Sequence, residues 1–460
     1  MLAQVWQALG GDPALLELVS AHGNPRLPGP LPVGELAMGA VAAQLLAAEE
    51  LRAAGRPLAR VVLDAVHIGL AFRSERFLTV DGVAAGPGFA ALSRFLPTAD
   101  GWVRLHANYP QHDAAVHRAL GPDPAAAAAG RSAQDVEDAV VAAGGVAAKV
   151  RTAQGWATHP QGVAVRDLPI LALRQIAPGP PQARTLHGLR VLDLTRVIAG
   201  PVGTRTLASY GADVLRVDSP RSPEDPSTLL ETGPGKRYVR LDLAEPVDRT
   251  TFEGLLAAAD VLVQGYRPGA LDAYGLHPNE LADRRPGLVM VTLSAWGAAG
   301  PWARRRGFDS IVQAATGIAD ETRDSGGTPG VLPAQALDHA AGHLVAAIVL
   351  RALTQARQEG GAWHGELSLA QLAAWLLAAS RSPAAPEPTG PTGPIAPIDP
   401  APYLMNLSSS AGTLTLVRPP GSPDWLRGPV QVAADEARWA AREIVQVSSA
   451  RPVTGRRSRR

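Results

Sequence analysis

The chain has 460 residues, 46% of them hydrophobic, a formal net charge of +1 and no cysteine. This composition suits a globular protein with a large core, and the missing thiols exclude disulfides, thiolate metal sites, iron–sulfur clusters and a cysteine nucleophile. The small net charge predicts no nucleic-acid partner, and no apolar run approaches the ~20 residues of a membrane span, which predicts no membrane contact. The N-terminus has no basic signal-peptide region, so a cytoplasmic protein is expected.

The first 180 residues carry helix and strand patterns in alternation. Helices are predicted over 33–54, 66–72, 113–120 and 133–143, and strands over 60–65, 102–107 and 146–151. Pro- and Gly-rich sequence that begins near Ile176 is typical of a linker. This part of the chain is therefore divided into a helical segment, 1–79, and a small α/β domain, 80–178.

After this linker, strands and helices alternate more regularly. Strands are predicted over 190–194, 213–217, 238–243, 261–264, 287–293 and 366–369, and helices over 202–210, 249–258, 338–357 and 370–379. This rhythm indicates an α/β fold whose 186–380 domain is a doubly wound, Rossmann-like parallel sheet. A Pro-rich linker (381–402), a C-terminal segment (403–447) and a disordered basic tail (448–460) complete the predicted organisation.

An internal repeat relates the two halves of the chain. Residues 31–37 line up with residues 332–338, and both stretches are followed by an Ala/Leu-rich helix, a short strand and another apolar helix. Ala37 stands in the first copy where Asp338 stands in the second. The two copies therefore differ at a position that could carry chemistry.

Asp338 follows a Gly/Pro-rich loop, 326–333, and opens a predicted helix. The simplest interpretation is a helix cap, which contributes ~1 kcal/mol by accepting hydrogen bonds from free amides. The helix dipole also keeps such a carboxylate ionised, which makes it a competent nucleophile toward activated acyl groups. His339 and His343 have the i, i+4 spacing of metal ligands, but a third ligand on that face is missing, so no metal site is predicted and hydrogen bonds are expected to satisfy one or both histidines.

The loop of small residues at 198–203 leads into a helix and leaves backbone amides open to an anion or to adenosine. Asp218 ends the next strand, where a ribose-binding acid would lie in an NAD-dependent oxidoreductase. That alternative lacks the G-x-G-x-x-G motif, and Pro201 removes an amide. The absence of G-x-x-x-x-G-K-[ST] and of G-x-S-x-G also disfavours a P-loop ATPase and an α/β-hydrolase.

Basic residues gather in the same half of the chain, mostly at strand ends or in loops. They are Arg196, Arg216, Arg221, Lys236, Arg237, Arg267 and residues 304–306. Each one alone is best explained as a solvated surface charge. As a group near the carboxyl ends of parallel strands, they indicate a polyphosphate ligand.

Residues 186–201 resemble the opening of family III CoA-transferases, the CaiB/BaiF family that includes formyl-CoA transferase, carnitine-CoA transferase and α-methylacyl-CoA racemase. Further stretches resemble the same family in order, at 210–218, 235–243, 259–269, 293–301, 307–317 and 336–343. The resemblance implies an enzyme that moves CoA from an acyl-CoA donor to a carboxylate acceptor, both of them small molecules, with no permanently bound cofactor. Family members form interlocked homodimers, so the resemblance allows two expectations: a homodimer, or a monomer in which the internal copy at 31–37 replaces part of the partner.

The resemblance also implies the residues of the site. Asp338 matches the catalytic aspartate, which attacks the thioester, releases CoA thiolate and holds the acyl group as a mixed anhydride. The thiolate then returns to give an Asp338–CoA thioester, which the acceptor carboxylate attacks, and backbone amides at the helix start are expected to stabilise the oxyanion. The family's matching regions and the basic cluster give the expected CoA-binding residues, which are Arg196, Val197, Ile198, Ala199, Arg216, Arg221, Lys236, Arg237, Tyr266, Arg267, Arg306 and Phe308.

The order of the resembling segments is rearranged, because residues 1–180 resemble the later half of the family. Segment 1–79 is interpreted as an inert pseudo-copy of the nucleophile-helix region, and the Ala/Leu-rich surroundings favour a non-polar acyl chain. Phe308 stands where the racemases have a histidine, which disfavours a racemase. Residues 264–265 and Ala273 replace a Glu-Asn pair and an arginine of the family, and these departures motivate a non-catalytic acyl-CoA-binding paralogue as the alternative.

Overall fold

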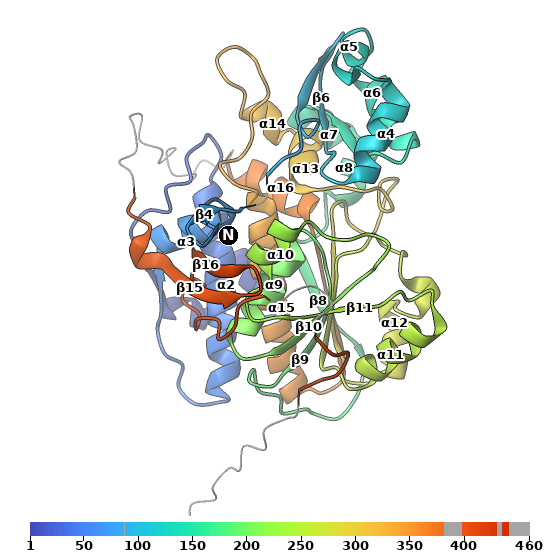
Figure 1. Cartoon of the computed structure of the whole chain (residues 1–460). Coiled ribbons are helices and arrows are strands. Elements are labelled where there is room, and N and C mark those ends of the chain that lie inside the picture. The colour runs from blue at the N-terminus through green and yellow to red at the C-terminus, as the bar shows by residue number, and fades with distance from the viewer. Residues whose placement is uncertain (87, 381–397, 430–434, 441–460) are drawn as a thin grey trace, which may run out of the picture.

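The computed structural model describes residues 1–86, 88–380, 398–429 and 435–440 (Figure 1). The largest sheet among these residues has seven strands. Its strands lie in the order β11 (Arg237–Arg240), β10 (Asp213–Asp218), β9 (Arg190–Leu194), β12 (Val261–Gln264), β13 (Val289–Ser294), β14 (Ala362–Ser368) and β8 (Leu171–Ala177). Strands β9 to β14 are parallel and β8 is antiparallel to β14, so the fold is mixed α/β, as predicted. The chain order reverses between β9 and β12, where the loops after these strands diverge and leave a crevice.

Strand β8 was not predicted from the sequence. The linker signature begins near Ile176, but Ile176 lies inside β8, whose residues pair with β14 from Leu171 to Ala177. The end of the segment assigned to the small α/β domain therefore belongs to the large sheet. A half-exposed edge strand followed directly by Pro and Gly has a weak apolar pattern, which explains the difference.

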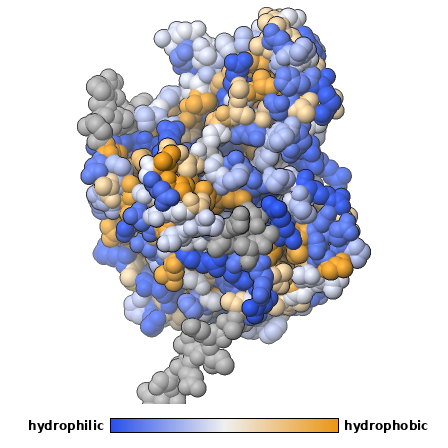
Figure 2. Space-filling model, in the orientation of Figure 1, coloured by the Kyte–Doolittle hydropathy of each residue, from blue (hydrophilic) through white to orange (hydrophobic). Residues whose placement is uncertain are grey.

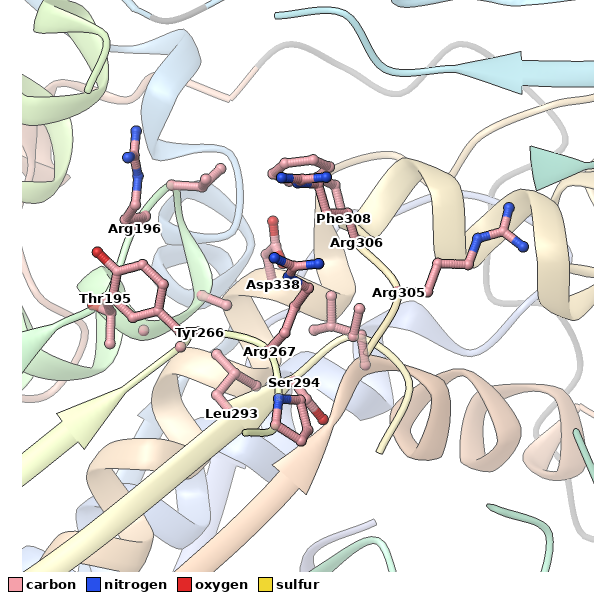
Figure 3. Close-up of a pocket in the computed structure, with 18 of the residues that line it drawn as sticks. Thr195, Arg196, Tyr266, Arg267, Leu293, Ser294, Arg305, Arg306, Phe308 and Asp338 are labelled. Carbon is pink, nitrogen blue, oxygen red and sulfur yellow. The ribbon is translucent and has the colours of Figure 1, made fainter. Parts of the chain in front are cut away.

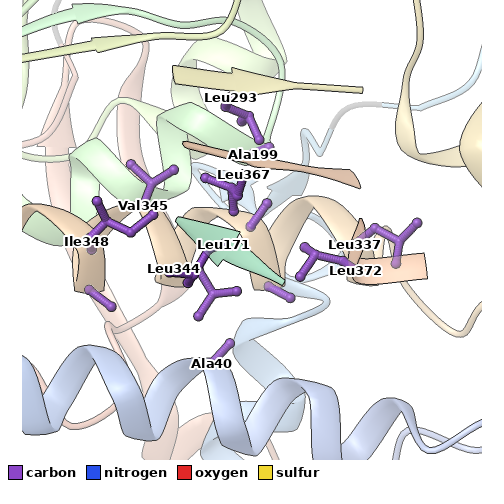
Figure 4. Close-up of a cluster of buried hydrophobic side chains, with 14 of the residues drawn as sticks. Ala40, Leu171, Ala199, Leu293, Leu337, Leu344, Val345, Ile348, Leu367 and Leu372 are labelled. Carbon is purple, nitrogen blue, oxygen red and sulfur yellow. The ribbon is translucent and has the colours of Figure 1, made fainter. Parts of the chain in front are cut away.

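Helix α15 (Ala336–Gln358) is the central helix of the core, between the sheet, α9 (Ala199–Ser209) and α2 (Val33–Ala53). Figure 4 shows Leu344 of α15 between the sheet and Ala40 of α2. Among the described residues, α15 alone is long and apolar enough to cross a membrane, although no apolar run of that length was expected from the sequence, and that stretch is entirely buried inside the protein. It is therefore best described as a core helix.

Glycines bring α9 and α15 close together next to the crevice. A Cβ added to Gly342 of α15 would lie 2.6 Å from the carbonyl oxygen of Ala199, and one added to Gly203 would lie 2.7 Å from the carbonyl oxygen of Gly342. The other helices of this half are α10 (Pro226–Thr232), α11 (Pro246–Ala257), α12 (Pro278–Arg284), α13 (Asp309–Thr316), α14 (Ile318–Glu321) and α16 (Leu369–Ala379).

The N-terminal segment packs against α15 mainly through α2. Its elements are α1 (Leu2–Ala8), β1 (Val19–His22), α2, β2 (Val61–Asp64) and α3 (Ala65–Ala71), and β1 and β2 form a parallel pair. A four-stranded sheet joins it to the C-terminal segment, in the order β15 (Leu404–Ser409), β16 (Gly412–Val417), β3 (Thr79–Val80) and β4 (Val83–Ala84). The expected linker and tail fall largely in residues 381–397 and 441–460, outside the described part of the chain.

A separate α/β unit with its own small core lies at one end of the molecule (Figure 1). Its strands are β5 (Phe95–Thr98), β6 (Gly101–Leu105) and β7 (Ala147–Lys149), and its helices are α4 (Pro110–Leu120), α5 (Pro124–Ala129) and α6 (Ala133–Ala142), followed by α7 (Ala153–Thr158) and α8 (Pro160–Val165). Figure 2 shows a largely polar face with one gathering of apolar residues close to where the N-terminus lies in Figure 1.

Candidate active site

An open cavity of about 380 Å³ lies at the carboxyl ends of the parallel strands (Figure 3). The loops after β9, β10, β12 and β13 line it, together with the first turns of α15 and α16 and residues of the 109–112 segment from the small α/β unit. Ligands of open α/β sheets bind at this edge, in the crevice where the strand order reverses. Eight of the thirteen site residues predicted from the sequence line the cavity, and they are Arg196, Val197, Ala199, Tyr266, Arg267, Arg306, Phe308 and Asp338.

Asp338 reaches the cavity from the third position of α15 and is only 6% exposed. The interpretation of Asp338 as the helix cap is wrong, because the cap position is Gln335 and the capping carboxylate belongs to another helix. Oδ2 of Asp309, the first residue of α13, accepts hydrogen bonds from the amides of Leu337 at 2.9 Å and Asp338 at 3.0 Å. The carboxylate of Asp338 is thus left free to meet a ligand.

The electrostatics of this pair differ from the sequence expectation that the helix dipole keeps Asp338 ionised. Burial and the negative charge of Asp309 raise the pKa of Asp338 well above its usual range. Burial also raises the pKa of Asp309 to about 6, despite its hydrogen bonds from Gln313 and the two helix amides. Two carboxylates this close cannot both ionise cheaply, so the site holds a carboxylate of raised basicity.

The loop after β9 is held in place by Glu224. One carboxylate oxygen of Glu224 accepts a hydrogen bond from the amide of Val197 at 2.9 Å, and the other accepts one from the hydroxyl of Tyr109 at 2.5 Å. Val197 has a positive φ of 66°, a strained conformation for a β-branched residue. Burial acts to raise the pKa of Glu224, but the charges of Arg216 and Arg196 outweigh this effect, so the pKa lies below its usual value. An ionised Glu224 therefore ties the loop to residue 109 of the small α/β unit.

Arg196, Arg267 and Arg306 bring positive charge to the cavity. Arg196 donates to the carbonyl of Ser222 at 2.6 Å and lies 3.5 Å from Glu224. Among the described residues, Arg267 and Arg306 have no carboxylate partner. Burial lowers the pKa of Arg267, and the positive charge of Arg306 lowers it further. Two neighbouring guanidinium groups without a counter-charge favour an anionic ligand.

Five of the predicted CoA-binding residues lie outside the lining of the cavity, and for the four basic ones the structure gives a different role. Ile198 only precedes α9 between two lining residues. Each basic residue is paired with a carboxylate: Arg216 with Asp218 at 2.9 Å, Lys236 with Asp193 at 3.0 Å, Arg237 with Asp213 at 2.6 Å and Arg221 with Asp242. Arg216 and Lys236 are completely buried. These side chains stabilise the strands and loops around the cavity rather than facing it.

The small α/β unit contributes cavity residues that were not predicted from the sequence. Tyr109 and His112, just before and within the first turn of α4, line the cavity. The ring of Phe308 stacks on His106 with 3.8 Å between centroids, and His112 meets it edge-on at 5.9 Å. Burial, aided by Arg306 and Arg196, lowers the pKa of His112 to about 4, so the imidazole is neutral. The sequence did carry a signal for these residues, because His106, Tyr109 and His112 lie within seven positions directly after strand β6.

The other candidates named from the sequence have structural partners. Nε2 of His339 lies 3.3 Å from Glu75, and the rings of His339 and His343 both pack on Phe72. Within the described ranges, no three His, Cys, Asp or Glu side chains form a metal-binding group. Asp218, the candidate ribose ligand of the NAD alternative, is buried against Arg216.

Comparisons with known proteins point to one family. Residues 186–398 match the model of CoA-transferase family III. The chain is 32% identical over 191 residues to the "probable fatty acyl-CoA transferase Rv3272" of Mycobacterium tuberculosis, across 39% of this chain and 48% of that protein. It is also 32% identical over 191 residues to the alpha subunit of succinyl-CoA–L-malate CoA-transferase of Chloroflexus aurantiacus, across 38% and 44% of the two chains.

Solved structures are also similar to part of this chain. The crystal structure of Rv3272 shares 32% identity over 43% of this chain and 58% of that one, with a TM-score of 0.40. A CAIB/BAIF family protein from Brucella suis shares 28% identity over 50% and 64% of the chains, with a TM-score of 0.39. The chain spans about half the length of the curated relatives it matches.

Proposed function

Because residues 186–398 match the model of CoA-transferase family III, we propose that this chain transfers CoA from an acyl-CoA donor to a carboxylate acceptor through a covalent intermediate on Asp338. The observation that carries the proposal is the position of Asp338, a buried carboxylate with no hydrogen bond to its side chain from the described residues, at the base of a cavity bordered by arginines. A carboxylate without a structural partner is free to act as a nucleophile, which supports the proposal.

In the proposed reaction, a carboxylate oxygen of Asp338 attacks the carbonyl carbon of the acyl thioester. The C–S bond breaks, CoA leaves as thiolate, and the acyl group remains on Asp338 as a mixed anhydride. The thiolate attacks the aspartyl carbonyl and releases the donor carboxylate, which leaves an Asp338–CoA thioester. The acceptor carboxylate then attacks the Asp338–CoA thioester and releases CoA thiolate, which leaves a mixed anhydride of Asp338 and the acceptor. The thiolate attacks the acceptor carbonyl, so the new acyl-CoA forms and the Asp338 carboxylate is released. The energy of the thioester is conserved throughout.

The CoA end of the substrate is assigned to the crevice between the loops after β9 and β12, which we interpret as a Rossmann-like, doubly wound arrangement. Arg196, Arg267 and Arg306 supply the positive charge that its phosphates require, and Tyr266 lies beside them. The apolar lining residues Leu293, Leu369 and Phe308 favour a non-polar acyl group. We further propose that the protein is cytoplasmic and forms a homodimer. Light scattering tests the dimer, because it measures the mass of the protein in solution.

Intact-protein mass spectrometry with a panel of acyl-CoA donors tests the proposed function. Wild type should gain the mass of CoA less water, and a carboxylate acceptor should remove it. Asp338→Ala should gain nothing, whereas Asp283→Ala, an exposed aspartate on α12, should behave as wild type. CoA binding by calorimetry without an adduct from any donor would instead favour the non-catalytic binding paralogue.

A further inference from the structure

The first step of the proposed reaction needs a hydrogen-bond donor for the thioester oxygen, and the start of α15 does not supply it. Attack on the carbonyl places negative charge on that oxygen, and a donor already in position stabilises the transition state. The amides of Leu337 and Asp338 already donate to Asp309, at 2.9 and 3.0 Å, and the amide of His339 donates to the carbonyl of Gln335 at 3.0 Å. The sequence expectation that these amides hold the oxyanion is therefore wrong, and the donor must come from another element.

Two hydroxyl groups that line the cavity are already committed. The Tyr109 hydroxyl donates to Glu224 at 2.5 Å, and the Thr195 hydroxyl donates to the buried carboxylate of Asp193. Turning either hydroxyl toward a substrate would leave a buried carboxylate short of a partner, which is costly. These hydroxyls hold the walls of the cavity and are not free to bind.

His112 is different, because it is a buried polar side chain without a partner. It lines the cavity, is 4% exposed, and neither of its ring nitrogens is hydrogen-bonded to any described residue. Nδ1 is enclosed by protein, so Nε2 is the nitrogen that remains for the cavity. Edge-on contacts with Tyr109 at 5.4 Å and Phe308 at 5.9 Å fix the plane of the ring. Nδ1 of His106, His339 and His343 is also buried without a partner, but of these histidines only His112 lines the cavity, so a ligand bound there can satisfy it.

We propose that the Nε2–H of His112 donates a hydrogen bond to the thioester carbonyl oxygen of the bound acyl-CoA while Asp338 attacks. This inference rests on the proposed function and adds a catalytic residue to it. One bond forms, between the Asp338 oxygen and the carbonyl carbon, and the carbonyl electron pair moves to the oxygen held by His112. When that pair returns, the C–S bond breaks and CoA leaves as thiolate. His112 keeps its proton, so no other reactant is needed.

The uncharged state of His112 suits this role. An imidazolium in the same cavity as Asp338 would stabilise the charge of the nucleophile and reduce its reactivity, whereas a neutral imidazole donates one hydrogen bond and adds no charge. Because burial, Arg306 and Arg196 lower the pKa of His112 to about 4, the ring stays neutral over the pH range in which Asp338 ionises. The same arginines that favour the CoA phosphates thus keep the donor neutral.

Single-turnover formation of the CoA adduct, followed by intact mass with a donor that labels wild type, tests the proposal. His112→Phe keeps an aromatic ring and removes the donor, so adduct formation should slow by roughly 10²–10³-fold, the usual cost of one oxyanion donor. His112→Gln replaces the donor and should recover most of the rate. His117→Phe, on the exposed side of the same helix, is the matched control and should behave as wild type. CoA affinity by calorimetry should not change in any variant.

The outcomes separate this proposal from the one on which it rests. No adduct on wild type with any donor overturns the proposed function and this inference together. An adduct that forms equally fast on wild type and His112→Phe overturns the role of His112 alone. If His112→Gln is as slow as His112→Phe while both keep the wild-type Tm, the donor assignment is wrong. Should His112→Phe not fold, His112→Leu provides the second variant without a donor.

Discussion

The pairing of Asp309 with Asp338 determines both where the nucleophile lies and when it is charged. Asp309 holds the first turn of α15 through two backbone amides, and its charge adds to the effect of burial, which raises the pKa of Asp338. The same side chain therefore positions the reactive carboxylate and increases its basicity. A more basic carboxylate is a better nucleophile once ionised, but it is ionised only at higher pH.

Asp309→Asn is expected to move the acid limb of the pH–rate profile for Asp338 acylation to lower pH. In wild type the reactive carboxylate is lost as pH falls through the raised pKa of Asp338. Asparagine removes the charge that raises this pKa, while its amide oxygen still accepts from the two helix amides. Rates of adduct formation measured against pH check this, with Asp283→Asn as a surface control. An acid limb that stays in place would contradict an effect of the Asp309 charge on Asp338.

The sequence predicts that Lys236 and Arg267 both bind CoA, but the structure indicates that substitution of Lys236 affects stability and substitution of Arg267 affects CoA affinity. Lys236 is fully buried and donates to Asp193 at 3.0 Å and to the carbonyl of Pro201 at 2.9 Å. Lys236→Met leaves Asp193 as an uncompensated buried charge, which typically costs about 3–5 kcal/mol of unfolding free energy. Arg267→Ala removes an exposed charge, so stability should not change while CoA affinity falls about tenfold. Denaturant unfolding and calorimetry on both variants check this, and a stable Lys236→Met with weakened CoA binding would reverse our assignment.

At this scale, the sequence could identify chemistry but not partners. Asp338, Arg196 and Arg306 follow from motifs whose residues are close in the chain. The role of Lys236 could not be predicted, because its carboxylate partner Asp193 lies on β9, far from it in the sequence. Arg216 pairs with Asp218 of its own strand, but only the fold shows that both side chains are buried. The pair of Asp309 and Asp338 was missed for the same reason, because only folding brings the first residue of α13 to the first turn of α15.

At the scale of elements, the approach of α9 to α15 sets the position of the loop that borders the cavity. Gly342→Ala adds a Cβ that would lie 2.6 Å from the carbonyl oxygen of Ala199, a lining residue. Overpacking of this kind typically costs about 1–3 kcal/mol, and relief requires the start of α9 to move. The variant should therefore lose both stability and CoA affinity.

Gly254→Ala is the matched control for Gly342→Ala, because it lies within α11 and an added Cβ meets nothing within 4 Å. Since alanine favours a helix by about 0.8–1 kcal/mol over glycine, this control should raise the free energy of unfolding. Thermal unfolding and calorimetry compare the two. A Gly342→Ala variant that gains stability as Gly254→Ala does would show that the two helices can separate freely.

Most elements themselves were predictable from periodicity. The helix at 33–54 and the strands at 190–194 and 261–264 carry continuous apolar patterns, and the structure places α2, β9 and β12 there. Strand β8 was missed, since an edge strand contacts the core on one face only and its sequence runs into a proline-rich segment. Pairing across the sheet, rather than the local pattern, determines that residues 171–177 form a strand.

For the whole molecule, two distant parts of the chain build one cavity. The second half of the chain supplies the residues that we assign to CoA, which are Arg196, Tyr266, Arg267 and Arg306. The small α/β unit in the first half supplies Tyr109 and His112. Glu137 of α6 joins the two parts: it accepts hydrogen bonds from Arg151 and from Arg305, both at 2.9 Å, and is 1% exposed. Arg305 directly precedes Arg306 and lies two residues before Gly307, so this contact fixes the loop that ends at Phe308.

Glu137→Gln should therefore slow acyl transfer more than it weakens CoA binding. The substitution leaves the buried Arg151 and the partly buried Arg305 without their shared carboxylate, an effect of about 3–5 kcal/mol on the free energy of unfolding. The small α/β unit should then hold His112 and Phe308 less firmly, while Arg196 and Arg267 keep their places in the other half. Single-turnover adduct formation and CoA calorimetry measure the two effects separately, with Glu245→Gln, whose side chain is 63% exposed, as the control. Equal losses of rate and of CoA affinity would show instead that both ends of the substrate depend on the small α/β unit.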